Sequence, residues 1–347
     1  MRGRKRRLSR LLAACLVLAA LVAAGGASFL AWRELGRPYS GWSGPYVDVE
    51  LDAGLSASEM LERLGQAGVL RRPALARRWL ALFGDAEGLH AGEYRFDEPI
   101  SPLGVLERLE SGAVLLHPVT VPEGLVNLEI ANRFVEAGFG PAEALLAAFA
   151  DPAAVRDLDP GADSLEGYLF PETYRFARGT APSSIAGALV ERFREAVGPT
   201  YARRAERLGL TLRQAVTLAS LIERETSVPG ERGRISRVFH NRLARGMRLQ
   251  CDPTVLYALH RAGRRVKALT YRDLEFDSPW NTYRVVGLPP GPIANPGLAS
   301  LEAAVAPPPG DELYFVAAPG GGHRFSSTHE QHLLAVAAWR TYSRSSR

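Results

Sequence analysis

An uninterrupted apolar run near the N-terminus is the strongest hydrophobic pattern in the chain. Residues Leu11 to Trp32 carry no charge and are rich in Leu, Ala and Val. A run of this length spans a bilayer as one helix. Six basic residues precede it and keep the N-terminus in the cytoplasm by the positive-inside rule: Arg2, Arg4, Lys5, Arg6, Arg7 and Arg10. The pattern predicts a cytoplasmic tail at 1–10, a transmembrane helix at 11–32 and an extracytoplasmic, periplasmic remainder.

A cleavable signal peptide is the alternative interpretation of the same run. Leu11 to Ala24 has the length of its apolar core, and Gly25 to Ala27 offers small residues for cleavage. We favour a retained anchor in the cytoplasmic membrane, because apolar residues continue through Phe29, Leu30 and Trp32. Both interpretations place the rest of the protein outside the cytoplasm.

A strand–turn–helix pattern then occurs twice. Residues 47–51 alternate like a half-buried strand, and an apolar helical face at 60–64 follows; residues 119–121 and 130–134 repeat this order. Three pairs of residues match between the copies: Gly54 with Gly124, Glu59 with Glu129, and Gly68 with Gly138. Between the copies the pattern predicts a helix at 75–83, a strand at 92–96 and a helix at 102–109.

These elements predict a small βααβ-type module at 46–117, preceded by a Gly-, Pro- and Ser-rich linker within 33–45. Such a module either binds an extended polymer or is a common structural unit that arose twice. Residues 118–347 are left as a second, larger domain. We therefore expect an α+β protein with an N-terminal transmembrane helix, a small α/β subdomain and a mixed α+β domain.

Two glutamates stand at the end of a predicted amphipathic helix at 212–226. Its apolar stripe is formed by Ala215, Leu218, Ala219 and Ile222, and Glu223 and Glu225 lie on opposite shoulders of that stripe. A carboxyl group at the edge of a buried stripe is partly desolvated, which raises its pKa and suits it to donate a proton. Alternatively both are solvated helix-end acids that pair with Arg224 or Arg232. Periodicity does not choose between the two glutamates.

Three further segments have clear local signatures. The prolines at 289, 290 and 292 make residues 287–294 an extended loop. Residues 313–317 are predicted to form a core strand, and residues 328–342 a closing helix. The stretch from Leu165 to Tyr174 concentrates aromatic and acidic side chains, which suit sugar rings but suit an ordinary core equally well.

Charge and composition exclude several classes of function. The chain has 42 Lys and Arg against 37 Asp and Glu, but without residues 1–10 the balance is 36 against 37, so the folded part has no basic footprint for nucleic acid. No P-loop, GxGxxG turn or HExxH motif is present, and the two cysteines, Cys15 and Cys251, are too few for a thiolate zinc site. His323, His329 and His332 lack the spacing of a metal site. We expect no metal, no cofactor and no nucleic-acid partner.

Several longer motifs together resemble one family, the YceG-like endolytic murein transglycosylases. The motifs, which run through most of the chain after Tyr46, are 121–124 (VPEG), 165–174 (LEGYLFPETY), 218–226 (LASLIERET), 238–243 (VFHNRL), 246–250 (GMRLQ), 252–257 (DPTVLY), 281–283 (NTY) and 287–294 (GLPPGPIA). The single N-terminal anchor also fits that family.

The resemblance implies a membrane-anchored enzyme that cuts peptidoglycan glycan strands internally, at the bond from N-acetylmuramic acid to N-acetylglucosamine. The products would end in 1,6-anhydro-muramic acid. The resemblance also implies that the module at 46–117 is LysM-like, and that peptidoglycan synthases of elongation or division are partners. The family's catalytic glutamate is followed by Thr or Ser, a pattern that maps to Glu225 and Thr226; Glu223 remains the fallback.

Supporting roles follow from the same motifs. Candidate substrate-binding residues, whose alternative role is to hold caps and turns of the fold, are Glu166, Tyr168, Glu172, Asn241, Gln250, Asp252, Asn281 and Tyr283. The chain departs from the family pattern at Cys251, where relatives usually have Thr or Ser, and at Gln331 to Leu333. We expect Cys251 to be a small core residue.

Two other functions remain open at this point. One is a non-catalytic scaffold that binds the cell wall through the LysM-like module. The other is a hydrolase that uses Glu172 together with Glu225 as a carboxylate pair.

Overall fold

The computed structural model describes residues 2–345, which divide into two compact units. Unit 1 comprises the chain up to His117 together with Ala177–Gly179, and unit 2 comprises Pro118–Phe176 and the chain from Thr180 onward. Both units are mixed α+β and mostly helical. Their three sheets have only two strands each: β1 with β2, β3 with β4, and β5 with β6.

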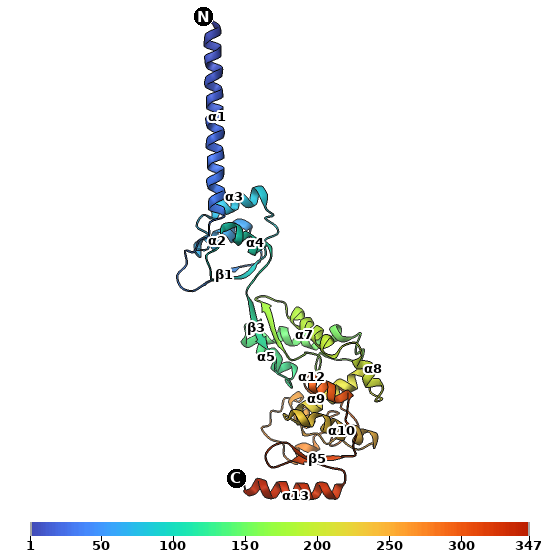
Figure 1. Cartoon of the computed structure of the whole chain (residues 1–347). Helices are drawn as coiled ribbons and strands as arrows, with labels where there is room; N and C mark the ends of the chain where they lie inside the picture. Colours follow the sequence, from blue (N-terminus) through green and yellow to red (C-terminus); the bar gives the residue numbers. More distant parts are fainter. Residues whose placement is uncertain (1, 346–347) are drawn as a thin grey trace. The chain divides into compact units, whose positions relative to one another are not determined.

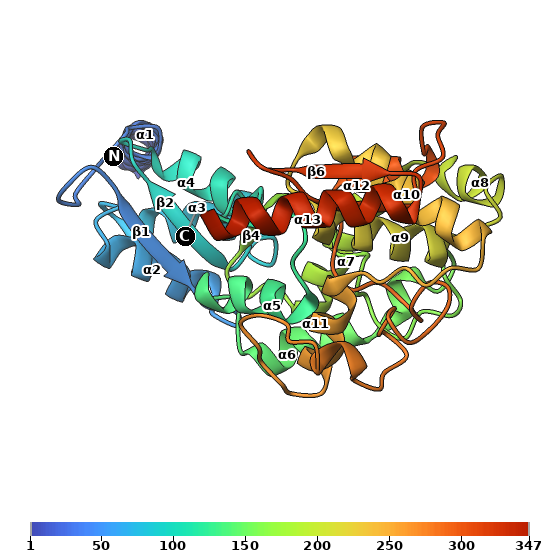
Figure 2. The same ribbon diagram turned by 90° about the horizontal axis from the view of Figure 1, so that it is seen from below.

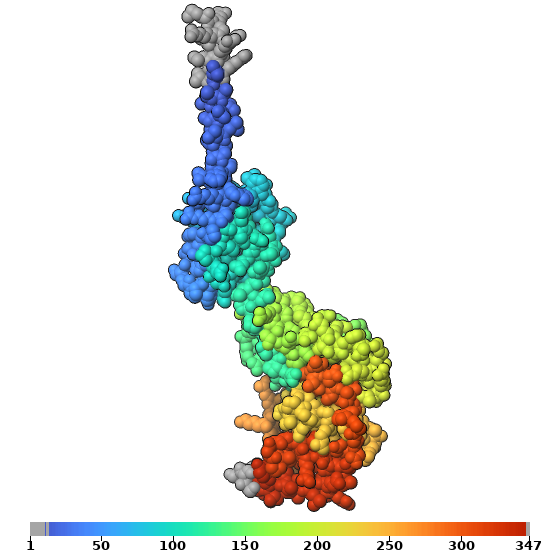
Figure 3. Space-filling model, in the orientation of Figure 1, coloured from blue at the N-terminus to red at the C-terminus, as the bar shows by residue number. Residues whose placement is uncertain are grey.

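The first helix of unit 1 is the predicted apolar helix. Helix α1 spans Arg2–Leu35, and its segment Ala14–Leu35 is long and apolar enough to cross a membrane. Between residues 16 and 30 its large apolar side chains are exposed, with Leu16 71% and Phe29 65% exposed, and Figures 1 and 3 show this part of α1 projecting from the rest of unit 1. Exposed leucines on this scale need an apolar solvent or a partner, because in water they leave a large unfavourable surface.

The rest of unit 1 has the predicted order of elements. These are β1 (Val47–Leu51), α2 (Ala57–Gln66), α3 (Pro73–Phe83), β2 (Gly92–Phe96) and α4 (Pro102–Glu110). The strands pair antiparallel, with Val49 opposite Tyr94. Inward-facing side chains of the strands pack on the helices in one core, which includes Leu61, Leu64 and Phe96.

The matched residues of the two strand–turn–helix copies have the same local roles. Glu59 accepts the backbone N–H of Ser56 at 2.8 Å, and Glu129 accepts that of Val126 at 3.0 Å, so each glutamate caps the start of its own helix. Gly54 and Gly124 both have positive φ, at 90° and 78°. The pattern therefore specified two equivalent turns, although the second copy lies in unit 2.

Unit 2 contains the remaining elements. They are β3 (Leu116–Thr120, beginning in unit 1), α5 (Asn127–Glu136), α6 (Ala142–Ala150), β4 (Thr173–Ala177), α7 (Pro182–Val197), α8 (Tyr201–Glu206), α9 (Leu212–Glu225), α10 (Arg232–Ala244), α11 (Asp252–Arg261), α12 (Leu298–Val305), β5 (Tyr314–Ala317), β6 (His323–Ser326) and α13 (His329–Ser345). Single turns of 3-10 helix occur at Pro152–Val155, Pro229–Glu231 and Asp273–Glu275.

Helix α9 is the centre of unit 2. Every residue from Ala215 to Ile222 is buried, because α8, α10, α11 and α12 all pack on it. Thr211 caps its first turn in a capping box with Gln214. The predicted stripe is thus buried, and the helix ends at Glu225, one residue before the predicted end. A helix enclosed on several sides places its last carboxylates at the edge of the core.

Two other predictions about unit 2 can be compared directly. Residues 287–294 form an irregular loop, as the prolines require. The strand at 313–317 exists, but its description as a core strand is wrong: β5 is half-buried along its length, because it pairs only with β6 in an antiparallel hairpin. Helix α13 covers this hairpin, as Figure 2 shows.

Candidate active site

Glu225 is the last residue of α9 and lies where that helix leaves the core. Burial raises the pKa of its carboxyl group from 4.5 to about 7, although the residue keeps some exposed surface. A carboxyl group with a pKa near 7 is partly protonated at neutral pH, so it can donate a proton and afterwards accept one. Among the described residues no ion pair engages Glu225, and the Cys251 thiol donates a hydrogen bond to its carboxyl group.

The residues around Glu225 come from the start of α11 and from the loop after 281. Cys251 is buried and directs its thiol at the Glu225 carboxyl group, and this hydrogen bond lowers the pKa of Glu225 against the larger effect of burial. Burial also raises the pKa of the Cys251 thiol well above its usual value, so it stays a neutral S–H donor. Cys251 is therefore a small buried residue, as predicted, and in addition it contacts the candidate acid.

Asp252 and Tyr283 form the next contact. The Tyr283 hydroxyl donates to Asp252 Oδ1 at 2.6 Å, and the negative charge of Asp252 contributes to the raised pKa of Glu225. Asp252 is exposed while Tyr283 is half-buried. The pair thus places an exposed carboxylate beside a proton donor, the arrangement that binds or orients a polyhydroxyl ligand.

Gln250 has an unusual backbone conformation beside these residues. Among the described residues other than glycine, only Gln250 has a positive φ, at 50°. Such a conformation costs about 1–3 kcal/mol and is typical of functional sites when the surrounding structure enforces it. Here the enforcement comes from buried Arg242, which donates to Leu313 O at 2.7 Å and to Leu249 O at 2.8 Å. Arg242 thus fixes the segment that carries Gln250 and Cys251.

Glu223 occupies a different environment from Glu225. Its carboxylate lies 3.5 Å from Arg232 Nη2 and accepts the backbone N–H of Gly297 at 3.1 Å, and its side chain is only 7% exposed. These partners hold Glu223 as a structural link between α9, α10 and the start of α12. The alternative of a helix-end acid paired with Arg232 therefore describes Glu223, whereas Glu225 has the environment of an acid–base group.

A histidine from the β5–β6 hairpin also faces this region. His323 Nδ1 lies 2.8 Å from Glu231 Oε2, and the backbone N–H of His323 donates to Glu231 Oε1 at 2.6 Å. Thr226, the residue after Glu225, donates to Glu231 at 3.2 Å. No pattern along the chain indicates this connection, because residues 226, 231 and 323 meet only in the folded protein.

A second polar site surrounds Glu166. It lines a cavity of about 690 Å³ together with Val126, Leu128, Glu129, Asn132, Tyr257, His260, Arg261, Gly263 and Arg265. Burial raises the pKa of Glu166 to about 8. The Tyr257 hydroxyl lies 3.5 Å from the Glu166 carboxyl group, and the Arg261 guanidinium lies 4.4 Å from the Trp280 ring. This cavity offers neutral and cationic donors and an aromatic surface to a ligand.

Asn295 connects this cavity to the fold and was missed by sequence reasoning. Its Oδ1 accepts the backbone N–H groups of Gly167 and Leu169, both at 2.9 Å, and its Nδ2 donates to Glu166 at 3.1 Å. The side chain is fully buried. It stands one residue beyond the 287–294 motif, and a lone Asn after a Pro-rich loop carries no pattern that distinguishes it.

Four predicted substrate-binding residues have structural partners instead. Tyr168 is buried and donates to Asp159, and Asn281 is fully buried and donates to Leu274 O and Phe276 O. Asn241 donates to Glu312 O at 2.9 Å, and exposed Glu172 pairs with Arg192. For these residues the alternative role, holding turns and helix contacts, fits the geometry best.

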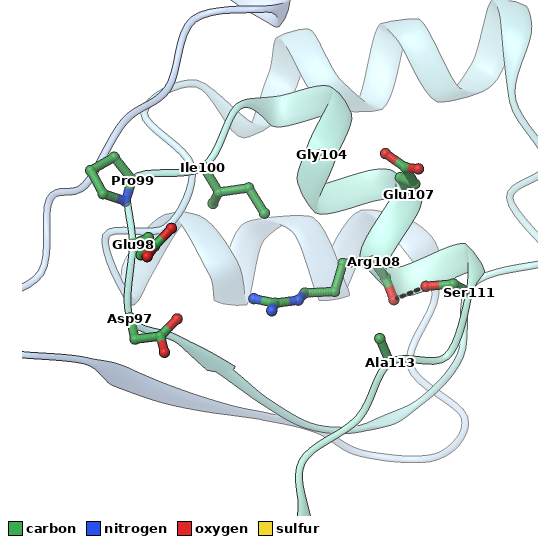
Figure 4. A pocket seen from close by; sticks show the side chains of 9 residues that line it. All are labelled: Asp97, Glu98, Pro99, Ile100, Gly104, Glu107, Arg108, Ser111 and Ala113. Carbon is green, nitrogen blue, oxygen red and sulfur yellow. Dashed lines mark hydrogen bonds between the residues drawn. The ribbon is translucent and has the colours of Figure 1, made fainter.

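Unit 1 has an open hollow of about 420 Å³ between the end of β2 and α4. Figure 4 shows Arg108 reaching across it toward Asp97 and Glu98, with Ser111 bonded to Arg108 O. Arg108 itself donates to Arg95 O at 2.9 Å. The hollow has the charged, solvated lining of an ordinary surface and no group prepared for acid–base chemistry. Within residues 2–345, no cluster of His, Cys, Asp and Glu has the geometry of a metal site.

Comparison with known proteins gives consistent matches. The YceG-like family model matches residues 49–338. A Bacillus subtilis protein named endolytic murein transglycosylase is 33% identical over 323 residues, which are 88% of each chain. A Streptococcus pneumoniae protein of the same name is 30% identical, and the match covers 93% of this chain and 64% of that protein. The crystal structure of a YceG-like protein from Listeria monocytogenes aligns with a TM-score of 0.56 and 33% identity, over 84% of this chain and 98% of that one.

Proposed function

Because this chain belongs to the YceG-like family, we propose that it is an endolytic murein transglycosylase, a lyase that cleaves peptidoglycan glycan strands between N-acetylmuramic acid and N-acetylglucosamine. The observation that carries this proposal is the environment of Glu225. It combines a desolvated carboxyl group with a pKa of about 7, freedom from ion pairs and a place at the end of a buried helix.

The reaction needs one acid–base group. Protonated Glu225 donates its proton to the glycosidic oxygen, and the bond from that oxygen to C1 of the muramic sugar breaks. The C6 hydroxyl of the same sugar then attacks C1, and the Glu225 carboxylate accepts the hydroxyl proton. One product gains a free hydroxyl and the other a 1,6-anhydro ring, with no water added. Attack within one sugar ring supplies the proximity for which a hydrolase needs a second carboxylate.

The neighbours of Glu225 support this role. Asp252 and Tyr283 lie beside it, and Gln250 precedes Cys251 in the chain; these three residues are proposed to hydrogen-bond the sugars next to the scissile bond. Arg242 and Cys251 are both buried. Arg242 is proposed to fix the segment that carries Gln250, and Cys251 is proposed to adjust the pKa of Glu225. The carboxylate whose charge acts on Glu225 is that of Asp252; Glu172, which pairs with Arg192, is therefore a poor second carboxylate for a hydrolase.

We also propose that α1 remains in place as a single-pass anchor of the cytoplasmic membrane. Unit 2 then works on strands outside the cytoplasm, close to the membrane, where new glycan strands are made. Peptidoglycan synthases of elongation or division are the expected partners, and the β1–α4 part of unit 1 is proposed to be a LysM-like module.

Product analysis tests the function. Purified glycan strands are incubated with the full chain in detergent, and the fragments are measured by mass spectrometry. We expect fragments with 1,6-anhydro ends, 18 mass units lighter than the products of hydrolysis, since no water is added. Reducing ends in place of anhydro ends would identify a hydrolase that uses a second carboxylate. Folded protein that binds strands without cutting them would favour the scaffold.

The pH dependence of cleavage follows from the pKa of Glu225. Donation requires the protonated form, which predominates below about pH 7 and is lost above it. We therefore expect kcat/KM to fall toward tenfold per pH unit above about pH 7. Initial rates between pH 5 and 9 measure this fall, which is the alkaline limb of the pH profile. A midpoint near 4.5, the value of an exposed glutamate, would show that Glu225 is not the acid in a desolvated site.

Two different substitutions of Cys251 should shift the midpoint of this pH dependence in opposite directions. The thiol lowers the pKa of Glu225 by hydrogen bonding, so Cys251→Ala, which lacks a donor, should shift the limb to higher pH. Cys251→Ser supplies a stronger donor and should shift it to lower pH. The same pH series on both variants checks this. An unchanged midpoint in both would exclude contact between residue 251 and the acid.

The cavity at Glu166 is proposed to bind a more distant part of the same substrate. Removing the guanidinium in Arg261→Gln should raise KM about tenfold, because a charge-assisted hydrogen bond contributes about 1.5–3 kcal/mol. The midpoint of the pH limb should not move, since the Glu225 environment is intact. Arg207→Gln, at an exposed position after α8, is the matched control. Equal KM values for both variants would show that the cavity at Glu166 does not bind the substrate.

A further inference from the structure

Helix α3 of unit 1 has two apolar faces. Ala76 and Leu80 are buried in the core of unit 1. At 100° per residue, Leu75, Trp79, Leu82 and Phe83 form a second stripe beside that face. Leu82 is 73% and Phe83 70% exposed, although both are large and apolar. A soluble surface helix needs only one apolar face, so the second stripe requires another explanation.

The second stripe faces the end of the apolar helix α1. The rings of Trp32 and Trp79 lie 5.6 Å apart, and those of Trp79 and Phe83 lie 4.6 Å apart. The two helices line an apolar groove of about 610 Å³, whose α1 side consists of Ala27, Ser28, Ala31, Trp32 and Leu35. Figure 1 shows α3 beside this end of α1. The groove is therefore continuous with the segment that is apolar enough to cross a membrane.

Basic residues lie at and beside the groove. Arg78 lines the groove itself. The adjoining pocket, which shares Leu75 with the groove and includes Glu34 of α1, is lined by Arg37, Arg71 and Arg72; all four arginines are exposed. Glu34 lies 4.0 Å from both Arg37 and Arg72, which leaves the four arginines in excess over this acid. Arginines around an apolar surface match the phosphates and acyl chains of anionic phospholipids.

We propose that α3 lies in the outer interface of the membrane that α1 spans, with lipid acyl chains in the α1–α3 groove and lipid phosphates on its arginines. This inference rests on the proposed anchoring by α1. Trp32 marks the depth, because tryptophans concentrate at the membrane–water interface. Trp79, in contact with Trp32, then lies at the same depth, and Leu82 and Phe83 reach among the acyl chains. Unit 1 is thus attached to the bilayer at two points, which fixes its orientation.

Spin labelling of the full chain tests this placement. In a Cys15→Ser background, where Cys251 is buried and does not react, single cysteines replace Phe83, Ala81 and Leu21 and are labelled with a nitroxide. Ala81 is exposed on the opposite side of α3 from the stripe and is the matched control on the same helix. The chain is reconstituted in vesicles of phosphatidylethanolamine and phosphatidylglycerol. Collision rates with oxygen, which enters lipid, and with a water-soluble nickel chelate are then measured.

We expect the ratio of oxygen to nickel collisions to be several-fold higher at 83 than at 81, and highest at 21. A lipid-like ratio at 21 with equal, water-like ratios at 83 and 81 would overturn the α3 proposal and leave the anchor intact. A water-like ratio at 21 would overturn the anchor and this inference with it. Exclusion of both reagents from position 83 would show that a protein helix fills the groove, which also overturns the assignment to lipid.

Discussion

Replacing Glu225 with Gln is expected to reduce strand cleavage at least about 10³-fold, because general acid–base catalysis contributes about 10²–10⁴-fold and Glu225 serves both proton transfers. Glutamine keeps the shape and polarity of the side chain, but its amide N–H is not acidic enough to protonate the glycosidic oxygen. The measurement is the rate of formation of anhydro-ended fragments by the full chain, at a pH near 6 where wild-type Glu225 is protonated.

A stability measurement separates this loss from unfolding. The folded-state pKa of Glu225 is raised to about 7 from 4.5. The stabilisation from its protonated form is therefore complete below about pH 4.5 and is lost as the pH rises through about 7. At pH 8 the ionised carboxylate opposes folding, so Glu225→Gln should be at least as stable as the wild type there. A markedly less stable variant would mean that the glutamate holds the fold.

Glu223→Gln is the matched control, two residues away on the same helix. Its amide oxygen can still accept the Gly297 N–H, and only the pairing with Arg232 is weakened. We expect cleavage by the folded variant within about tenfold of the wild type, since Glu223 donates no proton in the proposed reaction; the loss of its charge opposite Arg232, in a largely buried pair, should instead lower stability. The reverse result, an inactive Glu223→Gln with an active Glu225→Gln, would assign the acid to Glu223.

Replacing Asn295 with Leu is expected to lower the free energy of unfolding of unit 2 by about 2–6 kcal/mol, at about 1–3 kcal/mol for each buried donor left unpaired. The two donors are the backbone N–H groups of Gly167 and Leu169, which both depend on Asn295 Oδ1. Leucine has nearly the same size, so the loss reports the hydrogen bonds and not a cavity. The substitution also removes the hydrogen bond from Asn295 Nδ2 to Glu166, so ligand binding in the cavity at Glu166 should weaken.

Urea-dependent proteolysis of unit 2 measures this loss in the full chain. Asn241→Leu is the control, because Asn241 is half-buried and its acceptors, Gly310 O and Glu312 O, lie on a segment where water can replace it. We expect that variant to lose less than about 1 kcal/mol. Equal stability of Asn295→Leu and the wild type would contradict the role of Asn295 as a buried acceptor.

The local elements were predictable because each has a short-range physical signature. The strand at 92–96 alternates, Ser56 and Thr211 cap helices in capping boxes, and the prolines at 289–292 exclude regular structure. The strand at 313–317 was also predicted, but its burial was predicted wrongly. Whether an apolar strand lies in the core or in a two-stranded hairpin depends on its pairing partner. That partner is β6, and the residues of the turn before β6 do not indicate how deeply the hairpin is buried.

The sequence by itself determined an apolar N-terminal helix, two strand–turn–helix units and a pair of glutamates at the end of an amphipathic helix, because spacing along one element fixes these features. Only the tertiary structure distinguishes the environments of the two glutamates: Arg232 and Gly297 engage Glu223, while Cys251 and Asp252 lie beside Glu225. The role of Asn295 is likewise visible only in the folded chain, because the backbone groups that it binds lie more than a hundred residues away in sequence. Desolvation and charge act through space, so a pKa depends on neighbours that periodicity along a single helix cannot supply.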